Sequence, residues 1–278
     1  MKKYQLTLLS LCVAAFAQAK VTLPSFFTDN MVIQQNSQLT LPGKAKAGKQ
    51  VTVKVSWNYE KYTAKASADG HFSIEVPTPP AGGPFQITVS DGEKLVLNNV
   101  LSGEVWICSG QSNMEMPVAG WGKVMNYEQE VADADYPSIR LLQVKKTVAF
   151  SPQDNVEMNM NGWQECSSAT VPEFSSVAYF YARKLWKELN VPVGVIDCTW
   201  GGTPAESWTS HQTLKQVMGF QKKMAEMESA GFQREKLVEL YHQEMDEWLQ
   251  QFDARDPGFK DGVPQWISAL QTGNEWKL

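Results

Sequence analysis

The chain has 278 residues, and its 25 lysines and arginines stand against 30 aspartates and glutamates, which gives a formal net charge of −5. An acidic surface of this kind excludes nucleic acid and anionic membranes as electrostatic partners. Beyond the first 19 residues no run is apolar for long enough to cross a membrane, so we expect a soluble chain without a membrane span.

The first 19 residues have the pattern of a secretory signal peptide. Two lysines precede an apolar stretch from Leu6 to Phe16, and Ala17-Gln18-Ala19 offers the small residues of a cleavage site. We therefore expect cleavage near Ala19 and a mature protein that is secreted or periplasmic. A lipoprotein signal at Cys12 fits less well, because the residue before it is large.

Residues 20–100 alternate apolar and polar side chains in short runs. The runs are separated by glycines, prolines and Asp-Gly pairs, which form turns. Short alternating strands at regular spacing predict a small β-sandwich domain over residues 20–100. The expected strands are Gln50–Trp57, Tyr62–Ala66, His71–Val76, Phe85–Val89 and Lys94–Val100.

The pattern changes from residue 101 onward. Apolar strands are expected at Val105–Cys108, Ile139–Val144 and Val193–Cys198, and before the last of them comes a helix that Ser175 caps and that ends at Asn190. Strands that alternate with helices build a parallel sheet covered by helices. We therefore expect a parallel-sheet core over residues 101–211, which makes the whole chain an α/β protein.

Two of these strands end in loops of small residues. Ser112 follows the first strand, and Gly201 and Gly202 follow the last. Because ligands of open α/β sheets bind beyond the carboxyl ends of the strands, this serine can serve as a nucleophile and the glycine amides can bind an oxyanion. Both loops are also typical of simple turns, and Gly110–Met114 lacks the second glycine of the G-x-S-x-G elbow.

Five segments carry a resemblance to a known family: Ser109–Glu115, Trp200–Trp208, Phe27–Gln34, Ala81–Pro84 and Gly103–Trp106. Together they resemble the sialate O-acetylesterase family of the SGNH hydrolase superfamily, which also contains related acetyl xylan esterases. The resemblance implies a flavodoxin-like SGNH domain behind the sandwich and removal of O-acetyl groups from sugars such as sialic acid. It implies no metal or organic cofactor, because the mechanism needs only a serine, a base and oxyanion donors.

The resemblance also implies roles for single residues. Ser112 would be the nucleophile, and the amides of Ser112 and Gly202 would bind the oxyanion with help from the Gln111 side chain. Asn113 is expected at the substrate or, with Glu115, as a buttress of the turn, and a helix-capping role accounts for it equally well. Side chains expected to line the sugar site are Glu206, Trp208 and Trp121, although a core position for the tryptophans and a loop-orienting role for Glu206 stay open.

The sequence departs from this family in its base. SGNH esterases take their base from an Asp-x-x-His block, and none of the three histidines, His71, His211 and His242, has an aspartate three residues before it. Glu239 stands at that spacing from His242, but the periodicity places both on the polar face of one helix. The stretch 212–255 is expected to form a helical hairpin over the sheet, and residues 256–278 an irregular segment.

These observations lead to one main hypothesis and two alternatives. The chain is expected to be the N-terminal portion of a carbohydrate O-acetylesterase, with an incomplete SGNH core, from a truncated gene or a split reading frame. The alternatives are a non-catalytic glycan-binding remnant and an acetyl xylan esterase. The cysteines Cys108, Cys166 and Cys198 permit at most one internal disulfide and have no metal-binding spacing. Cys108 and Cys198 lie in apolar runs, so we expect these two to be small buried hydrophobes.

Overall fold

Short antiparallel strands fill the N-terminal part of the chain. The computed structural model describes residues 20–149, 151–255, 259–260 and 263–264, so the expected signal peptide lies outside the described residues. Two sheets form here. β2 (Gln38–Lys44) pairs with β5 (His71–Pro77), and β4 (Lys61–Lys65), β3 (Gln50–Val55) and β6 (Gly82–Ser90) follow one another in the larger sheet.

One core lies between these two sheets. Alternate residues of β5, namely Phe72, Ile74 and Val76, are buried, and Val51 and Val53 of β3 are buried in the same hydrophobic cluster. Alternation with period two gives each strand one apolar face, and the two apolar faces are removed from water together.

The strand β7 (Lys94–Gly110) is longer than the sequence predicted. We expected separate strands at 94–100 and 105–108, but the structure has one continuous strand of 17 residues. Gly103 does not break it: a Cβ on this glycine would lie 2.0 Å from the carbonyl oxygen of Pro192, so the glycine marks a close approach of two segments. The predicted domain boundary between residues 100 and 101 therefore falls inside β7.

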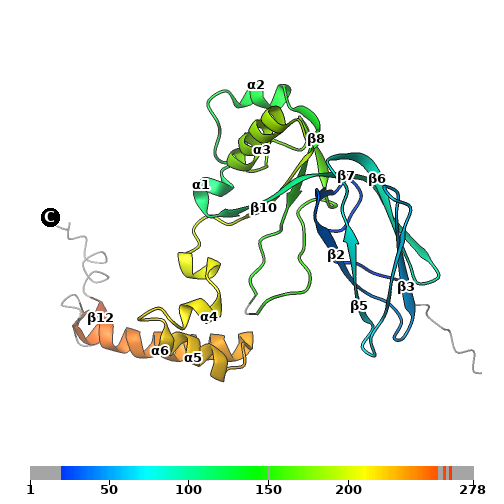
Figure 1. The fold of residues 1–278 in the computed structure, drawn as a ribbon. Coiled ribbons are helices and arrows are strands. Elements are labelled where there is room, and N and C mark those ends of the chain that lie inside the picture. The colour runs from blue at the N-terminus through cyan, green and yellow to red at the C-terminus, as the bar shows by residue number, and fades with distance from the viewer. Residues whose placement is uncertain (1–19, 150, 256–258, 261–262, 265–278) are drawn as a thin grey trace, which may run out of the picture. The chain divides into compact units, whose positions relative to one another are not determined.

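The second half of β7 belongs to a parallel sheet. Its residues 104–110 pair in parallel with β10 (Val193–Thr199), which pairs in parallel with β8 (Asp135–Gln143). β9 (Gln164–Ser167) adds an antiparallel edge, and β1 (Val32–Gln34) pairs with the middle of β7. The strand order is β4-β3-β6-β7-β10-β8-β9, so the fold is mixed α/β with one sheet running through it (Figure 1).

The helix α3 (Ser176–Leu189) packs on this parallel sheet, as its sequence pattern predicted. The Ser175 hydroxyl accepts a hydrogen bond from the Ala178 amide at 3.1 Å, and Asn190 ends the helix in a left-handed conformation. Its buried face shares a hydrophobic cluster with Val193 and Val195 of β10. Two shorter helices, α1 (Ser112–Glu115) and α2 (Tyr127–Ala132), precede β8.

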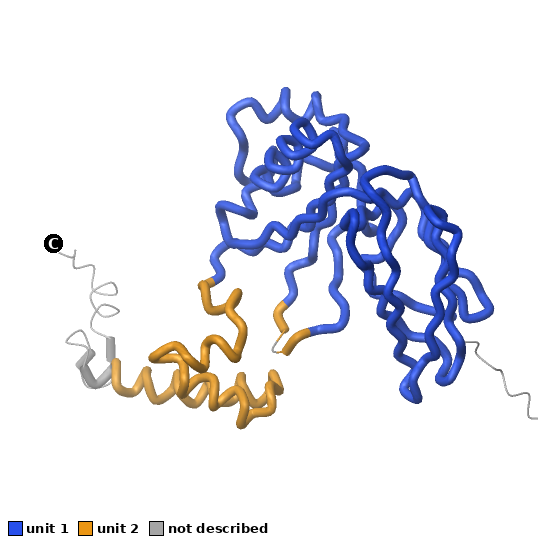
Figure 2. Tube along the Cα trace, viewed as in Figure 1, with its two compact units in different colours: residues 1–147, 153–203 blue, residues 148–152, 204–278 orange. Residues whose placement is uncertain are grey.

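The chain divides into two compact units, residues 1–147 with 153–203 and residues 148–152 with 204–278 (Figure 2). The second unit contains the 3₁₀ helix η1 (Ala205–Trp208) and the helices α4 (His211–Leu214), α5 (Gln221–Ser229) and α6 (Arg234–Arg255). The predicted hairpin over 212–255 thus corresponds to α4, α5 and α6. No helix in the described ranges combines the length and the apolar character needed to span a membrane.

The segment 256–278 was expected to be irregular. Within it β11 (Phe259–Lys260) and β12 (Val263–Pro264) pair as antiparallel strands, and the other residues lie outside the described ranges.

Candidate active site

Ser112 stands where β7 turns into α1. The strand ends at Gly110, whose φ of +151° is one that glycine adopts more easily than other residues, and a Cβ there would come within 2.8 Å of Met114. Ser112 is exposed at the first position of α1. The tight turn at Gly110 therefore presents the serine at the carboxyl end of a parallel strand.

The loop after β10 lies against this turn. The Trp200 amide donates to the Gly110 carbonyl at 2.9 Å, and the Gln111 side-chain amide donates to the Thr203 carbonyl at 3.3 Å. A Cβ on Gly201 would be 3.1 Å from the Ser112 Oγ. The structure thus brings together three of the predicted features: Ser112, Gln111 and the glycine loop.

The two glycine amides of that loop differ in availability. The Gly201 amide donates to the Glu115 carboxylate, so it is already engaged. The Gly202 amide and the Ser112 amide make no hydrogen bond within the described part of the chain. Gly202 also has a φ of +77°, where a side chain would be strained. Of the two glycines, Gly202 is therefore the one whose amide is free to receive an oxyanion.

Glu115 ties the nucleophile turn to the glycine loop. Its carboxylate accepts from the Gly201 amide and pairs with Lys146, and its side chain is 15% exposed. Burial raises the pKa of Glu115, but the hydrogen bonds from Lys146 and from the Gly201 amide outweigh burial and hold that pKa below its usual range. Glu115 therefore stays charged at neutral pH and buttresses the turn.

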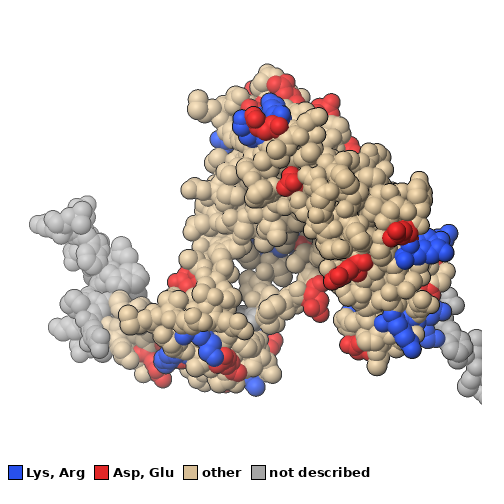
Figure 3. Space-filling view, in the orientation of Figure 1, with Lys and Arg blue, Asp and Glu red and all other residues tan. Residues whose placement is uncertain are grey.

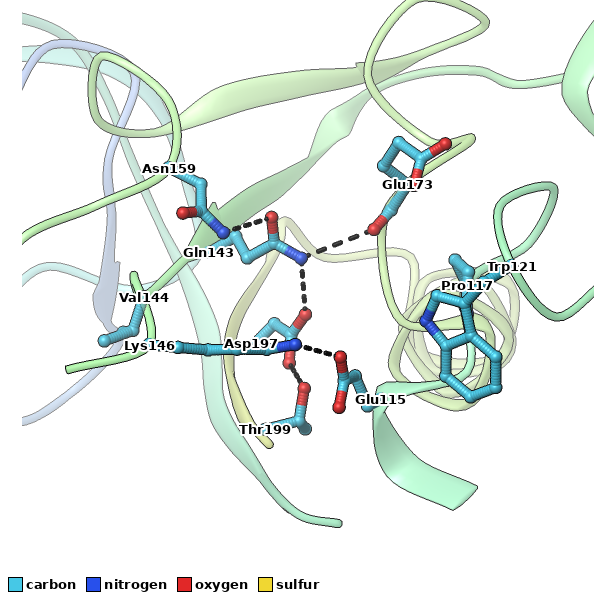
Figure 4. A pocket seen from close by; sticks show the side chains of 10 residues that line it. All are labelled: Glu115, Pro117, Trp121, Gln143, Val144, Lys146, Asn159, Glu173, Asp197 and Thr199. Atoms are coloured by element: carbon cyan, nitrogen blue, oxygen red, sulfur yellow. Dashed lines mark hydrogen bonds and ion pairs between the residues drawn. The ribbon is translucent and has the colours of Figure 1, made fainter. Parts of the chain in front are cut away.

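A polar network lies next to Glu115 around a cavity of about 210 Å³ (Figure 4). Its centre is Asp197 of β10, which is 1% exposed and accepts hydrogen bonds from Thr199 Oγ1 at 2.6 Å and Gln143 Nε2 at 3.0 Å. Burial raises the pKa of Asp197. Asp197 was not among the predicted site residues, although an aspartate inside the apolar run 193–198 was a usable signal.

The predicted sugar-binding residues do not line one common cavity. Trp121 is 67% exposed and lines the cavity beside Glu115 in the first unit. Glu206 and Trp208 belong to η1 in the second unit, where they line a different cavity. Asn113 is exposed on α1, and its side chain makes no hydrogen bond within the described ranges.

The three histidines have different surroundings. His71 begins β5, 3.9 Å from Asp69, and His242 lies in α6 against the Tyr241 ring. His211 Nε2 lies 2.9 Å from a Glu228 carboxylate oxygen. Sequence spacing supplied no acid for His211, because Glu228 comes from α5, 17 residues further along the chain.

The three cysteines among the described residues are free thiols. Cys108 and Cys166 are buried, and burial raises the pKa of Cys108 to about 11 and that of Cys166 to about 12. Cys198 is partly buried, and burial raises its pKa too. They are therefore neutral thiols rather than nucleophiles. Among the residues that the structure covers, no group of three or more His, Cys, Asp or Glu is arranged to hold a metal ion.

Basic and acidic side chains are mixed on the face of the molecule that Figure 3 shows. On the face seen in Figure 3, the basic side chains that gather have acidic ones beside them. A phosphate backbone is bound by a stripe or patch of basic residues, and this face offers none.

Comparison with known proteins connects this geometry to one family. The family model described as "Carbohydrate esterase, sialic acid-specific acetylesterase" matches residues 102–272. Sialate O-acetylesterases of Pongo abelii and Homo sapiens are 34% and 33% identical over 209 residues, which is 69% of this chain and 39% of each relative. The chain thus spans well under half the length of these curated relatives.

A solved structure agrees with the sequence relatives. The carbohydrate acetylesterase from Xanthomonas citri shares 32% sequence identity with this chain at a TM-score of 0.65. The match covers 70% of this chain and 43% of that protein.

Proposed function

This chain belongs to the family of sialic acid-specific acetylesterases among the carbohydrate esterases, and from that premise we propose that it acts in the removal of O-acetyl groups from sugars, with Ser112 as nucleophile. The observation that carries the proposal is the position of Ser112 at the end of β7, against a loop whose Gly202 amide is free.

The proposed reaction has two steps. Ser112 Oγ attacks the acetyl carbonyl carbon, a base takes the hydroxyl proton, and the amides of Ser112 and Gly202 donate to the oxyanion. The C–O bond to the sugar then breaks, the sugar oxygen receives the proton, and the acetyl group stays on Ser112. Water attacks this acyl-enzyme in the same way and releases acetate. Gln111 contributes by holding the Thr203 carbonyl and with it the glycine loop.

No residue of this sequence stands at the position of the family's catalytic base. The sequence has no Asp-x-x-His block, so we propose that the chain by itself hydrolyses acetyl esters slowly and that an added base accelerates it. The sugar at Ser112 is proposed to contact Asn113 and Trp121, which belong to the same unit as Ser112. Sialic acid or a related O-acetylated sugar is the proposed substrate, since the curated relatives are named for sialate.

The fold of each part of the chain and its export are also matters of proposal. We propose that the strands of residues 20–100 are a β-sandwich, that the parallel strands are part of a flavodoxin-like SGNH core, and that residues 1–19 direct export to the periplasm or the medium. The shared core of the two N-terminal sheets supports the first part, and the leader sequence supports the last.

A non-catalytic sugar-binding chain is the second candidate, because the missing base block favours it. The esterase and the non-catalytic sugar-binding chain are distinguished by measuring acetate release. The substrates are O-acetylated sialic acid and acetylated xylan, each with and without imidazole as an external base. Release above that of Ser112→Ala supports the esterase, and the preferred sugar separates a sialate esterase from an acetyl xylan esterase. Sugar binding without any release supports the second candidate.

A further inference from the structure

The larger of the two N-terminal sheets has a cavity of about 450 Å³ on its outer face. Strands β3, β4, β6 and β7 contribute the residues that line it. On β3 and β6 these residues alternate with the buried ones, so the cavity lies on the side of the sheet away from the hydrophobic core. Its volume is within the range of pockets that hold small ligands.

Positive charge is concentrated in this cavity. The charged residues that line it are three lysines, Lys54, Lys61 and Lys94. No acidic residue lines it, and none of the three lysines has an ion pair or a hydrogen bond within the described ranges. The chain as a whole has 30 acidic and 25 basic residues, and lysines elsewhere, such as Lys145 and Lys184, pair with glutamates. The cavity is therefore a local excess of positive charge on an acidic chain.

Two of the lysines stand directly opposite each other. Lys54 and Lys61 are partners in the antiparallel register of β3 and β4, where opposite Cβ atoms are about 4.5–5.5 Å apart. Like charges at such positions destabilise a sheet. Edge strands often carry lysines that prevent aggregation, which accounts for Lys61 on the edge strand β4. It does not account for Lys54, because β3 has a neighbour on both sides, whereas a bound anion would relieve the repulsion between the two.

The groups around this pair also favour an anion that carries hydroxyls. Glu60 does not neutralise the lysines: it accepts a hydrogen bond from the Tyr62 hydroxyl at 2.9 Å, and Tyr62 packs against the core. Thr88 is the register partner of Lys54, and Ser90 is the register partner of Lys94. Both hydroxyls line the cavity, where each can donate to an oxygen or accept from a sugar hydroxyl.

We propose that this cavity binds an acidic sugar, with the carboxylate between Lys54 and Lys61 and the sugar hydroxyls on Thr88 and Ser90. The choice of an acidic sugar rests on the proposed function, since the proposed substrate is sialic acid. The new element is a sugar-binding surface outside the active site, which holds the chain on a glycan rich in the acidic sugar.

The test measures binding without catalysis. The purified chain is titrated at low ionic strength with N-acetylneuraminic acid, with its uncharged methyl ester and with inorganic phosphate, while the backbone amides of β3 and β4 are followed by NMR. We expect the acid to shift these signals with millimolar affinity, the ester to bind at least about fivefold more weakly, and added salt to weaken binding. Phosphate should bind more weakly than the acid, because it does not reach the hydroxyls of Thr88 and Ser90 together with the lysines.

The lysine variants assign the binding to this cavity. Lys54→Gln and Lys61→Gln should each weaken it about two- to fivefold, the range expected for exposed charge pairs, and Lys54→Arg should stay within about twofold of the wild type. Lys44→Gln is the matched control, since it removes an exposed lysine from β2 in the other sheet and should change nothing. Lys54→Gln should also raise the thermal unfolding temperature slightly, because it relieves the repulsion from Lys61.

Three results would overturn the inference. They are the absence of shifts in β3 and β4, equal affinity for the acid and its methyl ester, and wild-type affinity in both Lys54→Gln and Lys61→Gln. Phosphate binding as tight as that of the sugar would also overturn it, because the lysines would then form an adventitious anion site only.

The outcome is separable from that of the proposed function. Ser112→Ala should bind the acidic sugar at β3 and β4 like the wild type, because Ser112 does not line this cavity. Binding there without Ser112-dependent hydrolysis would contradict the esterase proposal alone. Hydrolysis without binding there would contradict this inference alone.

Discussion

Replacement of Glu115 by alanine is expected to loosen the contact between the nucleophile turn and the glycine loop. The Gly201 amide would lose its acceptor, which costs roughly 1–3 kcal/mol for a partly buried donor. The pair with Lys146 adds at most about 1 kcal/mol, because the lysine side chain is 42% exposed. We therefore expect Glu115→Ala to lower the free energy of unfolding by about 1–4 kcal/mol at pH 7.

Glu115→Gln separates the hydrogen bond from the charge. Its amide oxygen can still accept from Gly201, so we expect a loss of only about 1 kcal/mol at pH 7. The folded pKa of Glu115 lies below its unfolded value, so its carboxylate stabilises the fold above the unfolded pKa and stops doing so as the pH falls through the folded pKa. The difference between wild type and Glu115→Gln should therefore shrink as the pH drops below about 4.3.

The assay is urea unfolding of the wild type and the variants between acid and neutral pH. Glu173→Ala is the matched control, because Glu173 is an exposed glutamate that lines the same cavity, and it should change stability by less than about 0.5 kcal/mol. If Glu115→Ala unfolds at the wild-type urea concentration at pH 7, Glu115 does not hold the loop and this reasoning is refuted.

Three further predictions concern the frame around the site. Gly103→Ala should destabilise the fold by about 1–3 kcal/mol in urea unfolding, because the new Cβ meets the Pro192 carbonyl; wild-type stability would contradict the close approach. Asp197→Ala should cost about 2–4 kcal/mol by the same assay, since its buried donors lose their acceptor, and a neutral effect would contradict the network. Cys108 and Cys166 should resist iodoacetamide at pH 8 in the native state and react after unfolding, whereas rapid native labelling would contradict their burial.

Local patterns predicted a large part of the fold. The helix α3 was predicted from its cap at Ser175 and its end at Asn190, because capping and periodicity depend on neighbouring residues only. The continuity of β7 was not predicted, because a glycine at position 103 is equally typical of a turn between two strands and of a close backbone approach inside one strand. Only the position of Pro192 in the folded chain distinguishes the two cases.

For the candidate site, the sequence predicted which loops meet but not which side chains engage them. The meeting of Ser112 with the glycine loop follows from a general rule, that parallel strands end at the same edge of a sheet. The resemblance singled out Gly202, whereas the residue pattern left both glycines open, because the engagement of the Gly201 amide depends on where the Glu115 carboxylate lies. The pairing of His211 with Glu228 was likewise hidden, since the packing of α5 brings the acid to the histidine.

The role of Ser112 as nucleophile is tested most directly by acetate release from an O-acetylated sugar in the presence of imidazole. Wild type is compared with Ser112→Ala and with Ser109→Ala, which changes an exposed serine three residues earlier on β7. We predict release by the wild type and by Ser109→Ala, and only the uncatalysed background with Ser112→Ala. Equal release by Ser112→Ala and the wild type would contradict the account.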